Sequence, residues 1–440
     1  MVAEFRNDSI PDRLPKRVFY GWWIVLAGTA IFIVANGIGF YCHGVFLDPL
    51  GMQHGWSKGS ISFAVTLYFF TAGVMGIILG RQIDRFGPRP VLILGSLVTG
   101  LSLLLLSHVK ELWHLYAVYL LMAVGWSGTS LIPINTLITN WFITRRGQAI
   151  SLTMTGLSIG GIILVPFATF LISRWGLMVA LPILGALFWV VIIPLALFVI
   201  KQRPSDIGQF PDGEPIVDSS EGEISPAPGY ASQMQEWTRL QAMRTLAFWS
   251  IVVAFFLAMT GQVAYLVHQM SFLSETLGLA GAASAVSITA GASIAGRLSL
   301  GSVIDRLDKR YVTMGLCLIQ ALAILSLAYS NHVSVLYLGT LAFGLTMGSI
   351  LMMQSLIIGE CFGLVSFGTV SGSVGLFVSS GAAIGPTIAG VIYDATHSYQ
   401  KAFIIFAAVS LMAMLAIFFA KPPRKFPIPK VEKRGHQICS

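Results

Sequence analysis

The sequence predicts an all-α polytopic membrane protein whose twelve hydrophobic helices form two similar six-helix halves. Three observations predict this class: the composition, the recurrence of long apolar runs, and a motif that occurs twice. Of the 440 residues, 55% are hydrophobic and only 10% are charged, and the mean hydropathy is +0.78. Because soluble domains carry about 25% charged residues, most of this protein's surface is expected to face lipid.

Long apolar runs recur along the chain with short polar breaks. A helix needs roughly 20 apolar residues to cross a bilayer, and twelve runs are long enough. They predict an N-terminal bundle with its tail over 1–200, a central loop over 201–245, a C-terminal bundle over 246–420 and a C-tail over 421–440. The predicted spans are 21–47, 61–80, 90–109, 114–138, 148–172, 177–200, 246–273, 281–304, 311–330, 333–358, 368–393 and 400–420.

The central loop is rich in Pro, Gly, Ser and acidic residues, a composition that cannot bury enough apolar surface to fold alone. Its last part, 233–245, fits either a short amphipathic helix on the membrane surface or a solvated linker. The first 19 residues contain no short apolar run that ends in a cleavage site. We therefore expect an uncleaved N-terminus.

The basic residues predict the orientation. Most of the 27 Lys and Arg lie in the two tails and in alternate loops, as the positive-inside rule requires if both termini are cytoplasmic. An odd number of spans would put the two basic tails on opposite sides of the membrane. An even number, twelve, is therefore favoured. We expect a multi-pass protein of the plasma membrane, or of the inner membrane in a bacterium. The exceptions are Lys58, Lys110, Arg174 and Lys401 in outer loops, and Arg297 within a span.

Several classes are disfavoured by the same residues. The scattered basic clusters form no single basic face, so the net charge of +8 does not indicate nucleic-acid binding. The chain has no phosphate loop, nucleophile motif or metal-ligand cluster, so we expect no enzyme, no cofactor and no metal. Neither the central loop nor the C-tail is suited to a folded signalling module, which disfavours a membrane sensor. The four cysteines have no metal or disulfide spacing: Cys42, Cys317, Cys361 and Cys439.

An internal repeat supports the two halves. GRQIDRFGPRPV (Gly80–Val91) and GSVIDRLDKRYV (Gly301–Val312) share G-x-x-I-D-R followed by a basic cluster. Each falls in the loop after the second span of its half. Duplicated bundles with a substrate held between them near the midplane are a design of secondary transporters.

These loops resemble the signature loop of the major facilitator superfamily, which Gly80–Arg89 matches. The second copy departs from it, with Asp308 where glycine is usual. Two further stretches resemble the monocarboxylate transporter family and its bacterial relatives, including the oxalate/formate antiporters. One is Tyr20–Trp23 at the start of the first span. The other is Asn140–Phe142 followed by Arg145–Ala149 and several glycines. The resemblance covers the transmembrane body and implies a carrier of small organic anions that works by alternating access.

Arg297 is the most informative single residue. It lies in SITAGASIAGRLSLG, a stretch without an acidic residue, and a charge at the centre of a spanning helix costs about 2.5–3.5 kcal/mol even on the most lenient scale. Its planar guanidinium matches a carboxylate with two hydrogen bonds, which favours a substrate anchor. The resemblance implies the same role, because monocarboxylate transporters carry a substrate-binding arginine in the eighth span. The alternative is an arginine that snorkels to the nearby cytoplasmic surface.

The chain departs from animal monocarboxylate transporters at two positions that the resemblance aligns. Ser293 stands where they place an aspartate, and their lysine of the first span falls near Tyr41, with His43 the only basic neighbour. The oxalate antiporter has a second cation in the eleventh span, whereas no Lys or Arg occurs between Thr369 and Asp394 here. One buried cation suits one carboxylate, so we expect monoanions such as lactate or pyruvate. Exchange of organic anions of the oxalate/formate type remains the alternative.

Other polar side chains complete the predicted site. His268 in the seventh span is the side chain most suited to titration near neutral pH, and with Arg297 it is assigned to proton coupling; it also fits a satisfied polar residue near the outer interface. Tyr265 lies on the same helical face. Asn135 follows a proline, which would free a carbonyl and shape a cavity, and Tyr68 is a further candidate. For each of these polar groups, packing between helices is the alternative. We expect the protein to function as a monomer with an anion and a proton as partners.

The repeated loops predict a cytoplasmic latch. A carboxylate is stabilised by the free amides at a helix N-terminus, so Asp84 is expected to face the eleventh span and Asp305 the fifth, in contacts that hold the outward-open state. The alternative treats the arginines as orientation signals only. The residues assigned to the latch are Asp84, Arg85, Arg89, Arg146, Asp305 and Arg306.

Overall fold

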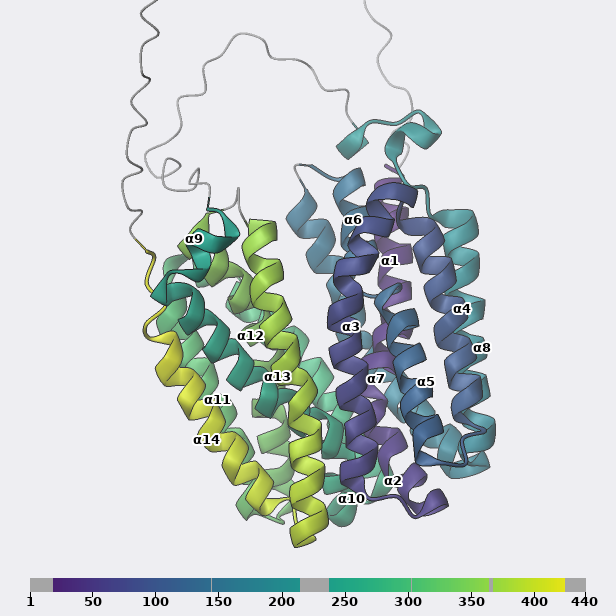
Figure 1. The fold of residues 1–440 in the computed structure, drawn as a ribbon, viewed down its shortest axis with the longest axis vertical. Coiled ribbons are helices and arrows are strands. Elements are labelled where there is room, and N and C mark those ends of the chain that lie inside the picture. Colours follow the sequence, from purple (N-terminus) through teal and green to yellow (C-terminus); the bar gives the residue numbers. More distant parts are fainter. Residues whose placement is uncertain (1–18, 144, 214–236, 302, 364–366, 424–440) are drawn as a thin grey trace, which may run out of the picture. The chain divides into compact units, whose positions relative to one another are not determined.

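The computed structural model describes residues 19–143, 145–213, 237–301, 303–363 and 367–423, and within these ranges the regular structure is helical, with no strand. Figure 1 shows the helices as long, roughly aligned rods within each bundle. The α-helices are α1 (Gly21–Asn36), α2 (His43–His54), α3 (Lys58–Phe86), α4 (Pro88–Leu106), α5 (Leu112–Ser127), α6 (Leu131–Trp141), α7 (Arg146–Trp175), α8 (Leu177–Pro194), α9 (Arg239–Met243), α10 (Leu246–Gly301), α11 (Lys309–Tyr329), α12 (Val333–Phe362), α13 (Phe367–Thr396) and α14 (Gln400–Ile417). Short π-helical turns cover Gly37–Tyr41 and Leu195–Val199, and 3₁₀ turns cover Pro204–Ile207, Pro211–Gly213 and Ile304–Arg306.

The described residues contain 11 helical segments that are long and apolar enough to cross a membrane. One of them, α10, has 56 residues and contains Gly278 in a non-helical conformation with φ 70° and ψ 173°. A straight helix of 56 residues would be about 84 Å long, whereas the hydrocarbon core of a bilayer is roughly 30 Å thick, and the residues on either side of Gly278, 246–277 and 279–301, are each long enough for one crossing. Because α10 must therefore cross twice, the described helices provide the twelve predicted crossings.

The chain divides into two compact units. Unit 1 contains residues 1–222 together with 266–291, and unit 2 contains 223–265 together with 292–440. The middle of α10 therefore clusters with the N-terminal helices. The domain boundaries given by the sequence, at 200 and 246, remain predictions.

In unit 1, α7 packs closely on α1 through two glycines spaced four residues apart. A Cβ atom on Gly156 would lie 2.5 Å from the carbonyl oxygen of Thr29, and one on Gly160 would lie 2.4 Å from that of Ile33. No side chain fits at either position without a backbone shift. These two glycines therefore let the fifth span pack directly on the first.

Unit 2 repeats this arrangement. A Cβ atom on Gly381 of α13 would lie 2.4 Å from the carbonyl oxygen of Phe256, and one on Gly385 would lie 2.2 Å from that of Thr260. The eleventh span thus packs on the seventh as the fifth packs on the first. The internal repeat seen in the loop motif extends to the contacts inside each unit.

The two stretches that carry the family resemblance lie against each other at one end of unit 1. The ring of Tyr20 lies 5.6 Å from that of Trp141, and the ring of Phe19 lies 5.4 Å from that of Phe142. Gly21 leaves room for this contact, since a Cβ atom there would lie 2.9 Å from the Phe142 ring. These motifs therefore form one aromatic cluster that joins the start of α1 to the end of α6.

The first part of the central loop is ordered by contacts with unit 1. The side-chain amide of Asn140 donates to the carbonyl of Gln202 over 3.2 Å, and the indole of Trp141 donates to that of Lys201 over 2.9 Å. The composition of the loop excludes a core of its own, but these donors fix residues 201–213 against the helix ends.

The second part of the loop was predicted to form either an amphipathic helix or a linker over 233–245. Within its described residues, 237–245, Arg239–Met243 forms a helix, α9, and its first turn is capped by Thr238 and Gln241. Residues 214–236 lie outside the described part of the chain.

Candidate functional site

In unit 2 the guanidinium of Arg297 lies beside the midpoint of α12. Arg297 is half-buried, and its Nη2 lies 3.2 Å from the point that a Cβ atom on Gly348 would occupy. Gly348 is close to the midpoint of the 30-residue helix Val333–Phe362. The Cα atom of Arg297 is one turn from the C-terminal end of α10. Because side chains of a helix point toward its N-terminus, the guanidinium lies further from that end than the Cα atom does.

Two neighbours shape this place. Ser293, one turn earlier on α10, is 1% exposed, and its carbonyl oxygen lies 2.3 Å from the same position beside Gly348. From the first part of α10, Gln262 donates its side-chain amide to the carbonyl of Met347 over 3.4 Å. The amide oxygen of Gln262 is buried and has no hydrogen-bond partner among the described residues. Unit 2 therefore brings a guanidinium and an unused acceptor to adjacent residues of α12.

Tyr265 lies in the packed interior of unit 2. It is fully buried, its hydroxyl is 3.2 Å from that of Thr340, and its ring centroid is 4.4 Å from that of Phe343. Tyr265 and His268 fall in different units. A role for Tyr265 in substrate binding stays a prediction.

In unit 1 the first span is irregular where it carries its polar residues. Helix α1 ends in the π-helical turn Gly37–Tyr41, and α2 begins at His43. His43 and Tyr68 converge on one carbonyl in this turn, that of Gly39: the His43 Nε2 atom is 2.9 Å away and the Tyr68 hydroxyl donates over 2.8 Å. Both side chains are buried. π-helical turns occur frequently at functional sites.

The fourth span is also interrupted, between the end of α5 at Ser127 and the start of α6 at Leu131. The indole of Trp126, just before this break, donates to the carbonyl of Ala35 over 3.0 Å, just before the π-helical turn. One turn into α6, the side-chain oxygen of Asn135 is buried without a hydrogen-bond partner among the described residues. Interrupted helices mark the substrate sites of many carriers.

His268 contacts the N-terminal helices of unit 1. It is fully buried, and its Nε2 atom lies 3.1 Å from the hydroxyl of Ser62 on α3. The carbonyl of the preceding residue, Val267, lies 2.5 Å from the point that a Cβ atom on Gly44 would occupy. This part of α10 is therefore in close backbone contact with α2.

A charged cluster that no local sequence pattern indicates lies one turn further along α10. Lys58 at the start of α3 forms a 3.2 Å ion pair with Asp48 of α2, and both side chains are about 20% exposed. Ser271 joins them, because its hydroxyl donates to Asp48 over 2.8 Å and accepts from the ammonium of Lys58. The cluster ties α2 and α3 to a segment of the predicted second half.

We expect neutralisation of either charge in this cluster to loosen the contact. Because both side chains stay about 20% exposed, Asp48→Asn or Lys58→Met should cost about 1 kcal/mol, roughly 1 °C in melting temperature for a chain of this length. The swap Asp48→Lys/Lys58→Asp should recover most of that loss. Thermal unfolding of the purified variants tests this, with the exposed Lys401→Met as the matched single-charge control. A swap no more stable than the sum of the single variants would contradict the pairing.

The first copy of the repeated loop is covered by the central loop. Gly87, between α3 and α4, has φ 80°, and a Cβ atom there would overlap the side chain of Gln202. The guanidinium of Arg89 donates to the carbonyl of Leu197 over 2.5 Å, while that of Arg85 lies 5.0 Å from the centre of the Phe86 ring. Both arginines therefore have contacts within unit 1.

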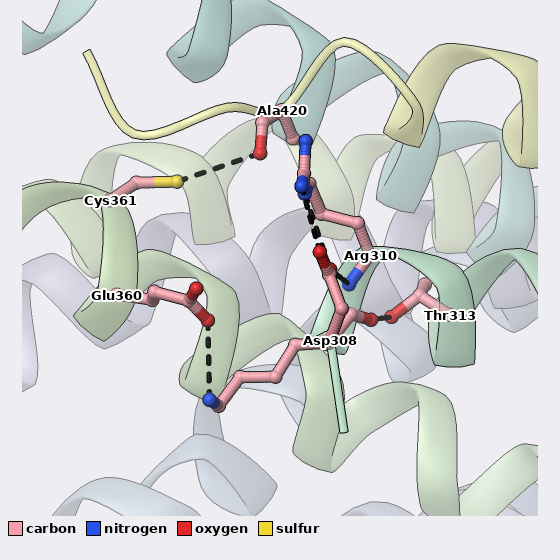
Figure 2. Close-up of polar contacts among 7 residues, drawn as sticks. Asp308, Arg310, Thr313, Glu360, Cys361 and Ala420 are labelled. Carbon is pink, nitrogen blue, oxygen red and sulfur yellow. Dashed lines mark hydrogen bonds and ion pairs between the residues drawn. The ribbon is translucent and has the colours of Figure 1, made fainter. Parts of the chain in front are cut away.

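The second copy uses its departure from the motif to start a helix. Asp308 caps α11 by accepting from the backbone amide of Arg310 over 2.9 Å, and its carboxylate pairs with the guanidinium of Arg310 over 2.7 Å. This hydrogen bonding lowers the pKa of Asp308 below its ordinary value. Figure 2 shows this pair beside Glu360, whose carboxylate lies 3.2 Å from Lys309. The acid that replaces glycine thus has a structural role.

The latch itself stays a prediction. The side chains of Asp84, Arg146 and Asp305 lie outside the described part of the structure, and the expected contacts would join the two units. Arg306 is exposed at the end of a 3₁₀ turn.

The chain matches one protein family over most of its length. The model of the Major Facilitator Superfamily matches residues 29–360. Among curated proteins, the uncharacterized MFS-type transporter YcxA of Bacillus subtilis is 24% identical over 414 residues, which cover 92% of this chain and 97% of that protein. Monocarboxylate transporter 13 of Bos taurus is 26% identical over 421 residues, which cover 92% of this chain and 89% of that protein.

Solved structures show the same fold. The nucleoside transporter NupG superimposes with a TM-score of 0.71 at 14% identity, covering 90% of this chain and 99% of that one. A bacterial homologue of the lysosomal transporter Spinster, inward-facing and occupied, gives 0.66 at 16% identity, covering 93% and 97%. Twelve crossings, two repeated bundles and a family match over most of the chain lead to one assignment: this protein belongs to the major facilitator superfamily and is a multi-pass membrane transporter.

Proposed function

We propose that this transporter carries small monocarboxylate anions of the lactate or pyruvate type, together with a proton, by alternating access. The observation that carries the proposal is the guanidinium of Arg297 at the mid-depth of α12. Its planar guanidinium presents paired N–H donors, and a substrate carboxylate can accept two hydrogen bonds from it.

The neighbours of Arg297 favour a small monoanion. Ser293 and Gly348 bring α10 and α12 so close that a methyl group has no room between them. No Lys or Arg occurs in α13, so the described helix offers no second cation for a dicarboxylate. The similarity to monocarboxylate transporter 13 supports the same substrate class.

A proton is the simplest coupling ion for this site. A monoanion that binds together with one proton adds no net charge. The loaded site therefore keeps the single positive charge of Arg297 that the empty site has. His268 is the histidine we assign to this step, because it is buried beside Ser62 in a segment of α10 that contacts α3. The protein acts as a monomer, with both termini cytoplasmic.

Transport into liposomes tests the proposal. With the purified protein reconstituted, an inward proton gradient should drive accumulation of labelled lactate or pyruvate, and a protonophore should reduce uptake to equilibration. Oxalate should compete weakly. Uptake that ignores the proton gradient and instead rises with internal oxalate or formate would show anion exchange and contradict proton coupling.

A further inference from the structure

A polar cavity of about 390 Å³ lies at one end of unit 1, where the central loop covers the ends of α3, α4 and α6. Its charged lining residues are Arg85, Arg203 and Asp206, and amide side chains of Asn140 and Gln202 complete the polar wall. Both arginines are exposed. The cavity is therefore open to a ligand that approaches along the surface.

The charge around this cavity is positive. The carboxylate of Asp206 accepts a hydrogen bond from the backbone amide of Arg203 over 3.0 Å, so it is engaged in its own turn. Further basic side chains flank the lining residues: Arg81 precedes Arg85 by one turn of α3, Arg89 opens α4, and Lys201 precedes Arg203. A cluster of cations around an open polar cavity suits an anion.

A second cavity, of about 520 Å³, lies beside the first and is almost entirely apolar. It runs between α3 and α4 with α5 as its floor, and these three helices lie side by side in Figure 1. Its lining on α4 extends from Pro90 to Val98, which is about 12 Å along the helix axis. Gln82 is the one lining residue with a polar side chain.

Close packing of small residues creates the floor of this apolar cavity. A Cβ atom on Gly95 of α4 would lie 2.7 Å from the carbonyl oxygen of Gly125 on α5. Because both residues lack side chains, the wall is recessed while Leu94 beside it is 63% exposed. The cavity opens on a membrane-spanning surface, so it is reached from the lipid.

Phe86 lines both cavities, and the Arg85 guanidinium lies 5.0 Å from the centre of its ring. We propose that the two cavities form one site for an anionic phospholipid. The headgroup phosphate binds Arg85 and Arg203 in the polar cavity, and an acyl chain fills the apolar cavity as far as Val98. Basic pockets between spanning helices on the cytoplasmic side bind anionic headgroups in this way.

A lipid fits these observations better than a soluble anion. A free phosphate or carboxylate would use the arginines but would leave the adjoining apolar cavity empty, and a neutral lipid would fill the apolar cavity without using the arginines. Only an amphipathic anion uses both parts. The site lies wholly within unit 1, and its test is independent of the substrate proposed above.

Native mass spectrometry of the detergent-purified full chain tests the proposal with three probes: phosphatidylglycerol, phosphatidylcholine with the same acyl chains, and glycerol 3-phosphate. We expect one phosphatidylglycerol to bind at least tenfold more tightly than phosphatidylcholine, and no binding of glycerol 3-phosphate. Arg85→Gln/Arg203→Gln should weaken phosphatidylglycerol roughly tenfold to thirtyfold. The control Arg239→Gln/Arg244→Gln, which removes two exposed arginines from unit 2, should leave it unchanged.

A second variant tests the apolar cavity separately. Leu94→Trp, at an exposed position of its wall, should weaken both lipids by a similar factor while the melting temperature stays near that of the parent. Val98→Trp should do the same from the inner end. Binding of glycerol 3-phosphate as tight as that of the lipid would overturn the proposal in favour of a soluble-anion site. Equal binding of the two lipids, or equal losses in the two double variants, would also overturn it.

Discussion

Replacement of Arg297 by alanine is expected to abolish both carboxylate binding and carboxylate uptake. Each hydrogen bond to a charged group contributes about 1.5–3 kcal/mol. Loss of a two-bond contact therefore costs about 3 kcal/mol or more, which lowers affinity at least a hundredfold. Because the side chain lies at the mid-depth of α12, no solvent-exposed cation at a helix end can replace it.

Thermal stabilisation by a panel of carboxylates is the measurement that isolates binding. Lactate and pyruvate should raise the melting temperature of the parent and leave Arg297→Ala unchanged. Arg297→Lys should retain a smaller shift, because an ammonium keeps the charge but lacks the planar fork of the guanidinium. Arg174→Ala, which removes an exposed arginine of unit 1, serves as the control. Equal stabilisation of the alanine variant by every acid would show that the anchor lies elsewhere.

The sequence predicts the helices and the repeat well because both are properties of local patterns. The length and hydropathy of each apolar run indicate whether it can cross the membrane. The two G-x-x-I-D-R loops mark equivalent positions in the two halves. The pairs Gly156–Gly160 and Gly381–Gly385 then make equivalent close contacts in the two units. A spacing of four residues in a helix is sufficient to predict such a contact face.

The interruptions of the first and fourth spans were not predicted. The runs 21–47 and 114–138 are apolar on average, and an average over a window conceals a π-helical turn at Gly37–Tyr41 or a break before Leu131. The polar, glycine-containing run 128–130 was the available signal for the second break. It favours turn over helix.

The contacts of the charged residues could not be predicted, because they join segments that are distant in the sequence. Lys58 was assigned to an outer loop, but its ion pair with Asp48 is completed by Ser271, more than 200 residues away. Asp308 is different, because its carboxylate caps α11 through a residue only two positions away, a local contact that the N-cap preference of aspartate favours. Whether Lys58 is solvated or paired depends on tertiary packing.

A methyl group at Gly348 is expected to disrupt the same site by a different route. The Cβ atom of Gly348→Ala would lie 2.3 Å from the carbonyl oxygen of Ser293, 3.0 Å from its carbonyl carbon and 3.2 Å from Nη2 of Arg297. The first two neighbours are backbone atoms of α10, so the helices must separate. Overpacking of this kind costs about 1–3 kcal/mol. Because the guanidinium is displaced as well, carboxylate uptake should fall at least tenfold.

Two other glycines separate the effect on the helices from the effect on the guanidinium. Gly381→Ala on α13 would place a Cβ atom 2.4 Å from the carbonyl oxygen of Phe256, which strains a helix pair of the same unit at a position where Arg297 is not among the nearest atoms. Gly315→Ala on α11 meets nothing within 4 Å and should be neutral or slightly stabilising, since alanine favours a helix more than glycine does. We expect both Gly348→Ala and Gly381→Ala to lower the melting temperature, but Gly348→Ala to cause the larger loss of lactate-induced stabilisation. If Gly348→Ala retained the full carboxylate response, the guanidinium would not bind substrate beside α12, and the anchor role of Arg297 would fail on geometry even if its alanine variant were inactive.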